Sequence, residues 1–172
     1  MFASKRGEQI TFDSRSELAI GILLEKYIEG FKLIPGETIQ IPIGKHCYCD
    51  FRVKDRFFEY HPINIRYECG KEFARDVERS FLKLSLEQAY FAKLKLQEQL
   101  KKEYFDRRLY LIQTSFGKEA NLVVCVNPEE VWEYVIQKYA KGKVKLGVFR
   151  EEFRAALFAE PLDEYSRRRF RI

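Results

Sequence analysis

The chain has 172 residues, of which 46% are hydrophobic and 33% are charged, and its net charge is +5. This composition predicts a globular domain with a core and excludes a disordered chain. No apolar run approaches the roughly 20 residues of a membrane span, the first residues lack the apolar core of a signal peptide, and four irregularly spaced cysteines make no disulfide framework. We therefore expect a cytoplasmic protein without membrane contact, and the positive charge suits a polyanionic partner such as nucleic acid.

The first predicted element is a helix that starts near Ser14 and stops at Gly30. Ser14 can cap this helix, and Glu17 three residues later completes a capping box. Isoleucines then alternate with other residues over 37–44, which predicts a strand, and a proline within it favours a position at the edge of the sheet.

Two further strands are predicted over residues 46–53 and 56–61, joined by a tight turn. Alternation in the first puts Cys47, Cys49, Phe51 and Val53 on one face and Tyr48, Asp50 and Arg52 on the other. In the second, it puts Phe57, Glu59 and His61 on one face. The spacing of Cys47 and Cys49 does not suit a zinc site, and we interpret them as small core residues.

A long helical stretch is predicted over residues 71–105, and Ser85 and Gln88 form a second capping box that divides it. Two more strands are predicted over 108–115 and 120–127, the second of them buried because its apolar run is continuous. A helix over 127–142 has Asn127 as its cap and Pro128 in its first turn.

The order of these elements predicts an α/β fold with a mixed sheet flanked by helices. We assign residues 1–142 to the core, including the helical segment 71–105. Residues 143–172 form a C-terminal extension, with a short strand over 143–149, a short helix over 150–160 and a basic tail.

Acidic residues inside two strand-like segments are energetically costly if the strands are buried. A hairpin of these strands brings Asp50 near Glu59, with His61 on the same face as Glu59. Carboxylates in such a cluster can hold Mg²⁺ or Mn²⁺, and Glu17 can add a third. Structural explanations stand beside this one: a cross-strand pair facing Arg52 or Arg56, and a capping role for Glu17.

A helix that carries a Glu, an Asp on one strand and Glu-x-Lys on the next resembles the PD-(D/E)xK arrangement of restriction-endonuclease-like nucleases. The resemblance covers about Ser14 to His61. It implies a mixed sheet of about five strands flanked by helices and metal-dependent hydrolysis of phosphodiester bonds. It also implies Mg²⁺ or Mn²⁺ on Asp50, Glu59 and Glu17, and a homodimer in many members.

The chain departs from this pattern where the family has its lysine, because His61 stands there. His61 can act as a base, or a lysine from elsewhere can take the place of the motif residue. The candidates for that lysine are Lys93, Lys95 and Lys45. A third interpretation is a nuclease-like fold that has lost its activity.

The sequence thus supports a metal-dependent endonuclease, with DNA as the favoured substrate. The alternatives are an inactive module of the same fold that binds nucleic acid or a protein, and an unrelated α/β scaffold. The residues expected to contact phosphates are Lys45, Arg52, Arg167, Arg168, Arg169 and Arg171.

Overall fold

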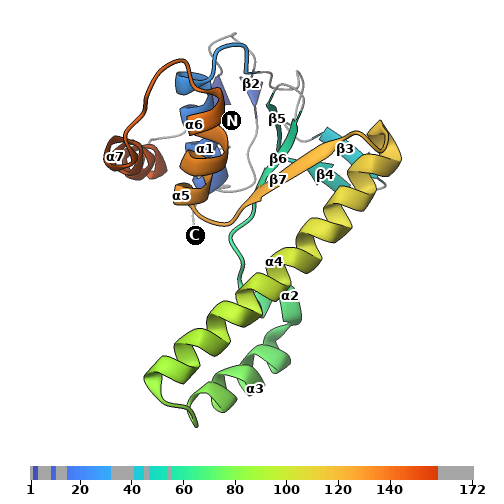
Figure 1. Ribbon diagram of the computed structural model, residues 1–172, viewed down its shortest axis with the longest axis vertical. Coiled ribbons are helices and arrows are strands. Elements are labelled where there is room, and N and C mark those ends of the chain that lie inside the picture. Colours follow the sequence, from blue (N-terminus) through green and yellow to red (C-terminus); the bar gives the residue numbers. More distant parts are fainter. Residues whose placement is uncertain are drawn as a thin grey trace.

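The centre of the protein is a small mixed sheet, seen in a computed structural model that describes residues 2–3, 9–10, 15–31, 41–44, 47–53 and 56–158. Its strands are β5 (Phe51–Val53), β6 (Arg56–Tyr60) and β7 (Asn121–Cys125). Strand β6 is central, antiparallel to β5 and parallel to β7 (Figure 1). The expected α/β class and mixed sheet are confirmed, whereas the described residues give this sheet three strands instead of about five.

The predicted strand over 46–53 is interrupted at Asp50. It forms β4 (Cys47–Cys49), which pairs with β3 (Ile41–Gly44), and β5, which pairs with β6. The predicted single face of Cys49 and Phe51 is wrong, because the bend at Asp50 sends these two side chains into different hydrophobic clusters. A further short pair joins β1 (Phe2–Ala3) to β2 (Gln9–Ile10).

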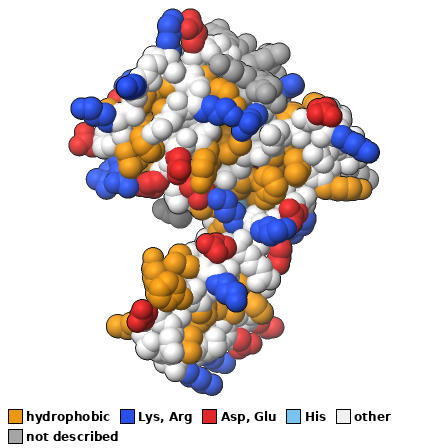
Figure 2. All heavy atoms as spheres, in the orientation of Figure 1, with side chains coloured by type: hydrophobic (Ala, Val, Ile, Leu, Met, Phe, Trp, Pro, Cys, Tyr) orange, Lys and Arg blue, Asp and Glu red, His pale blue; other side chains and the backbone are white. Residues whose placement is uncertain are grey.

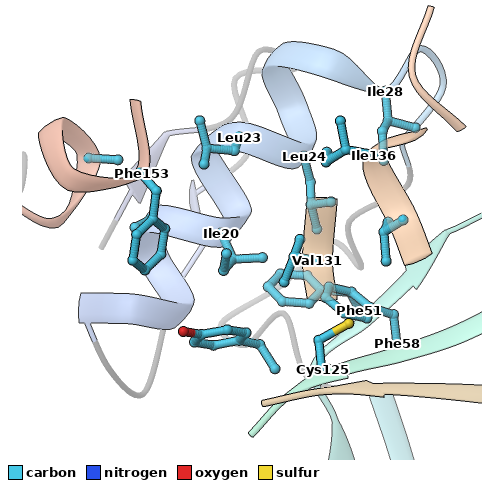
Figure 3. Packing of buried hydrophobic residues seen from close by; sticks show 14 of the residues in the cluster. Ile20, Leu23, Leu24, Ile28, Phe51, Phe58, Cys125, Val131, Ile136 and Phe153 are labelled. Atoms are coloured by element: carbon cyan, nitrogen blue, oxygen red, sulfur yellow. The ribbon is translucent and has the colours of Figure 1, made fainter. Parts of the chain in front are cut away.

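One face of the sheet is covered by a helix that precedes its strands in the chain and by the helices that follow β7. They are α1 (Arg15–Tyr27), the continuous helical segment α5 (Pro128–Val131), η1 (Trp132–Ile136) and α6 (Gln137–Tyr139), and α7 (Leu146–Leu157). Phe51 and Phe58 project from the sheet into this layer (Figure 3). They meet Leu24 of α1 and Val131 of α5, so the larger hydrophobic cluster lies here.

The opposite face is covered by the C-terminal half of α4 (Leu86–Phe116). The prediction of a strand over 108–115 is wrong, because these residues continue α4. Side chains spaced four residues apart continue from the preceding turns of the helix and form one face of α4 that packs toward the sheet. Its members are Leu100, Tyr104, Arg108, Ile112 and Phe116. The helix stops only at Gly117, whose φ of 98° suits glycine.

The N-terminal half of α4 leaves the sheet and forms a helical arm with α2 (Ile65–Cys69) and α3 (Lys71–Phe81) (Figure 1). The predicted capping box at its turn is confirmed, since Ser85 accepts from the Gln88 backbone and the Gln88 side chain accepts from Ser85. Apolar side chains gather on the arm's surface (Figure 2). Leu82 and Leu86 are 85% and 92% exposed, so the arm buries few of its own apolar groups.

The segment predicted as a C-terminal extension contributes α7, and the short strand expected over 143–149 is wrong. Phe149, Phe153 and Ala156 are spaced for one helix face and are buried in the larger cluster, so burial selects a helix there. Residues 159–172, with the basic tail, lie outside the described residues, as does the expected cap Ser14. In the described part of the chain, no helix combines the length and apolar character required to cross a membrane.

Candidate functional site

The register of the β5–β6 hairpin places Asp50 opposite Glu59. Phe51 pairs with Phe58, so the next position outward on each strand is Asp50 and Glu59. The backbone N–H of Tyr60 donates to Asp50 Oδ2 at 3.0 Å, which fixes the carboxylate at the end of the hairpin. The expected approach of the two acidic residues is therefore present.

Glu17 supplies a third carboxylate to the same region. It lies in the first turn of α1 and is buried, with 5% of its surface exposed. Burial raises the pKa of Asp50 well above its usual range, and the negative charges of Glu17 and then Glu59 raise it further. Asp50, at the bend between β4 and β5, is thus close enough to Glu17 of α1 and to Glu59 of β6 for their charges to interact.

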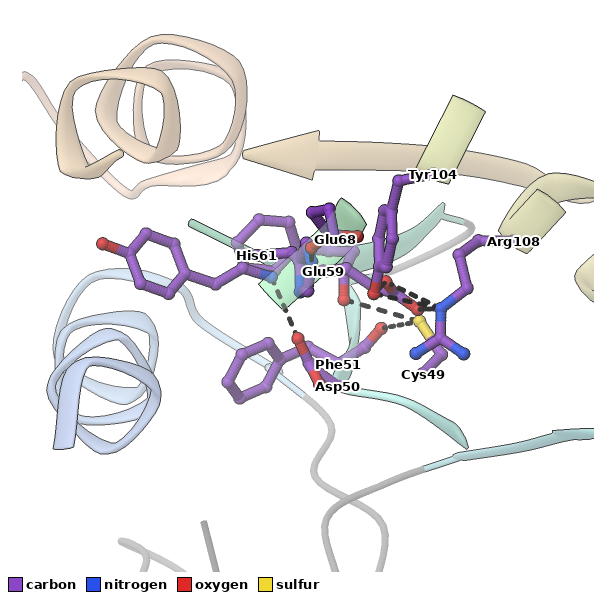
Figure 4. A network of polar contacts seen from close by, with 10 residues as sticks. Cys49, Asp50, Phe51, Glu59, His61, Glu68, Tyr104 and Arg108 are labelled. Atoms are coloured by element: carbon purple, nitrogen blue, oxygen red, sulfur yellow. Dashed lines mark hydrogen bonds and ion pairs between the residues drawn. The ribbon is translucent and has the colours of Figure 1, made fainter. Parts of the chain in front are cut away.

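Glu59 is fully buried and is held by two residues of α4 (Figure 4). The hydroxyl of Tyr104 donates to Oε2 of Glu59. The Nε atom of Arg108 lies 2.9 Å from Oε1 and 3.1 Å from Oε2 of the same carboxylate. These contacts balance the charge that burial would otherwise leave uncompensated.

Glu59 in turn changes the pKa values of the residues around it. Burial is the largest single effect on Arg108 and opposes its positive charge, but the charges and hydrogen bonds of Glu59 and Tyr104 together outweigh burial, so the pKa of Arg108 is raised. Burial and then the charge of Glu59 raise the pKa of Tyr104, so its hydroxyl stays protonated as a donor. Burial, then Glu59 and Asp50, also raise the pKa of the Cys49 thiol, which is therefore not a reactive thiolate.

His61 follows β6 and faces α4, as its alternation with Glu59 predicts. Its Nε2 atom lies 2.6 Å from Oε1 of Glu68 on α2, and its ring stacks on Tyr104 with centroids 3.9 Å apart. The ring is 24% exposed. Its orientation is thus set by a carboxylate and an aromatic ring (Figure 4).

Several expected site residues lie elsewhere. Lys93 is exposed on the helical arm, 11 residues before Tyr104 on the same helix, which is about 16 Å along its axis. Lys95 is exposed beside it. Neither lysine reaches Glu59. Arg52 is exposed on β5 and lies over the ring of Phe57. Lys45 and the four arginines of the tail lie outside the described residues.

Tyr104, Arg108 and Glu68 complete the cluster and were not anticipated from the sequence. A signal existed for the first two. They are four residues apart, and they interrupt an otherwise apolar stripe formed by Leu100, Ile112 and Phe116. A polar pair in the buried stripe of a helix needs a partner across the interface, and Glu59 is that partner. No such pattern marks Glu68.

The donor set consists of carboxylate oxygens, which by their chemistry suit Mg²⁺ or Mn²⁺. Within the described ranges, no group of three or more His, Cys, Asp or Glu side chains is placed to hold a metal ion. Comparison with protein-family models, curated proteins and solved structures gave no significant match. The fold and site therefore define an α/β protein with a buried carboxylate cluster.

Proposed function

We propose that this protein is a metal-dependent nuclease that hydrolyses phosphodiester bonds in nucleic acid, with DNA as the favoured substrate. The observation that carries the proposal is the position of Asp50 opposite Glu59 across the hairpin, with Glu17 of α1 near enough for its charge to act. Burial first, and then the charges of Glu17 and Glu59, raise the pKa of Asp50 well above its usual range. Like charges held together at a cost in stability are typical of functional sites. The resemblance of the same three residues to the PD-(D/E)xK pattern supports the same conclusion.

Asp50, Glu59 and Glu17 are not placed to hold an ion as they stand in the metal-free protein, so in this proposal a metal ion would draw the three carboxylates together. When bound, Mg²⁺ or Mn²⁺ would make a water molecule more nucleophilic and offset charge on the phosphate. The chain's own contribution is positional: the Tyr60 backbone orients Asp50, and Glu68 orients the His61 ring. A ring so placed can accept the proton of a water that attacks phosphorus while the bond to the 3′-oxygen breaks.

A second candidate is an inactive module of the same fold. It is favoured by the contacts of Glu59, whose carboxylate is already held by Tyr104 and Arg108. Such a module would bind nucleic acid or a protein without metal dependence.

A cleavage assay tests the proposal. Labelled duplex DNA, junction DNA, single-stranded DNA and RNA are incubated with wild type, Asp50→Asn and the control Asp106→Asn, in Mg²⁺ or Mn²⁺ and in EDTA. Asp106 is a matched control because it is an exposed aspartate on α4. We expect metal-dependent cleavage by wild type and the control, and loss of at least about a hundredfold in Asp50→Asn. Salt-sensitive binding without cleavage of any substrate would support the inactive module instead.

A further inference from the structure

The carboxylate cluster has a cation that the family pattern does not place there. Arg108 comes from α4, 49 residues after Glu59 in the chain, and its side chain is 20% exposed. Its charge also acts on Asp50, where it lowers the pKa against the larger effects of burial, Glu17 and Glu59. Arg108 therefore contacts Glu59 directly and also acts through its charge on Asp50.

The position that carries lysine in the family pattern holds no lysine here. His61 occupies it, and its Nε2 atom is engaged by Glu68. Lys93, one of the lysines expected to replace the motif residue, lies on the arm, about 16 Å from Tyr104 along the axis of α4. Among the described residues, the cation in contact with Glu59 is Arg108.

A guanidinium and a divalent cation compete for the same carboxylate. Both contacts of Arg108 with Glu59 are made through Nε. Rotation about side-chain bonds can carry the guanidinium off the carboxylate without moving the backbone of α4. Guanidinium groups bind phosphate oxygens strongly and with defined geometry, so a released Arg108 has a ligand in the nucleic-acid backbone.

We propose that Arg108 supplies the positive charge that the family pattern places on its lysine. Arg108 holds Glu59 in the metal-free protein, leaves Glu59 when a divalent cation binds, and then contacts the substrate phosphate. This inference rests on the proposed nuclease function and names a residue that the family pattern does not contain. Tyr104 is a positioning residue in this scheme, because its hydroxyl contacts both Glu59 and, at 3.1 Å, Arg108 Nε.

The scheme predicts opposite effects of one substitution on two measurements. Arg108→Gln removes the competitor of the metal, so we expect Mn²⁺ to bind about tenfold more tightly, a change that corresponds to one charge-assisted hydrogen bond. The same variant loses the phosphate contact, so cleavage falls at least about a hundredfold. A purely structural role would weaken both together.

Mn²⁺ affinity is measured by titration calorimetry and cleavage on the substrate that wild type cuts best, with circular dichroism as the check of folding. Arg107→Gln is the matched control, since it removes the neighbouring exposed arginine on the same helix. Arg108→Lys keeps the charge, and we expect it to restore part of the cleavage. Wild-type protein labelled with ¹⁵N in arginine supplies a measurement that requires no folded Arg108→Gln. Mg²⁺ should shift the Nε–Hε signal of Arg108, assigned with Arg108→Lys, and leave that of Arg107 in place.

The outcomes separate the two proposals. If wild type neither binds Mn²⁺ nor cleaves, the nuclease function fails and this inference fails with it. If wild type does both, the inference alone is overturned by an Arg108→Gln affinity that is unchanged or weaker, or by an Nε signal that saturating Mg²⁺ does not shift. Tighter binding with lost cleavage, or a shifted Arg108 signal, supports it.

Discussion

Replacing Glu59 by glutamine tests how the buried pair contributes to stability. The substitution keeps an oxygen for the Tyr104 hydroxyl but removes the counter-charge of Arg108, whose Nε atom lies 2.9 Å from Oε1. Breaking a buried pair costs about 3–5 kcal/mol. We take the lower end, about 3 kcal/mol, because Arg108 keeps 20% of its side chain exposed and the repulsion between Glu59 and Asp50 is relieved. For a domain of this size, the melting temperature should fall by about 6–12 °C.

The assay is thermal and urea unfolding at pH 7 in EDTA, followed by circular dichroism. Glu78→Gln is the control, since Glu78 pairs with Arg66 at the surface and is 55% exposed, and its loss should cost at most about 1 kcal/mol. In a double-mutant cycle, Glu59→Gln with Arg108→Gln should cost less than the sum of the two, by about 1–3 kcal/mol. A Glu59→Gln melting temperature equal to that of the control, or strictly additive effects, would refute the reasoning.

Two further predictions concern Asp50 and the turn of the arm. Asp50→Asn should stabilise the metal-free protein at pH 7, by about 1.4 kcal/mol for each unit by which folding raises the pKa of this carboxyl. A carboxyl whose pKa is raised in the folded state destabilises the protein as pH rises above the pKa of that carboxyl in the unfolded chain, about 3.9. The stability gained by Asp50→Asn should therefore vanish below about pH 4 in melting curves measured across pH. A gain that does not change with pH would contradict this cause. Ser85→Ala should cost about 1 kcal/mol through the lost capping box, measured by urea unfolding against Ser80→Ala, and equal costs in both variants would argue against the cap.

Local signals predicted much of the fold. The Ser85–Gln88 box and the Asn127 cap mark helix starts that the structure confirms, because a cap depends on residues within one turn. The predicted strand over 108–115 is wrong because it relied on too short a stretch of sequence. Leu109 and Leu111 alternate over a short window, but the period that decided the structure extends from Leu100 to Phe116, and burial against the sheet favoured the longer pattern.

The candidate site divides in the same way. The approach of Asp50 and Glu59 follows from a hairpin with a short turn, so the sequence was sufficient to predict it. The contacts of Tyr104 and Arg108 with Glu59 span 45 and 49 residues, and they depend on how α4 packs across the sheet. A strand over 108–115 would put Arg108 in a different element from Tyr104, and only in one continuous helix does their spacing of four residues place them on the same face.

Helix α4 mechanically couples the helical arm to the carboxylate cluster, because the same helix belongs to both. Its 31 residues span about 46 Å, and Arg108 lies about 33 Å from the Leu86 end. A rotation of the helix by about 5° around Arg108 would therefore sweep the tip of the arm by about 3 Å. Conversely, a force applied to the tip of the arm would tilt α4 and act on the contacts of Glu59. One unbroken helix carries the arm at one end and Tyr104 and Arg108, the two residues that hold the Glu59 carboxylate, further along.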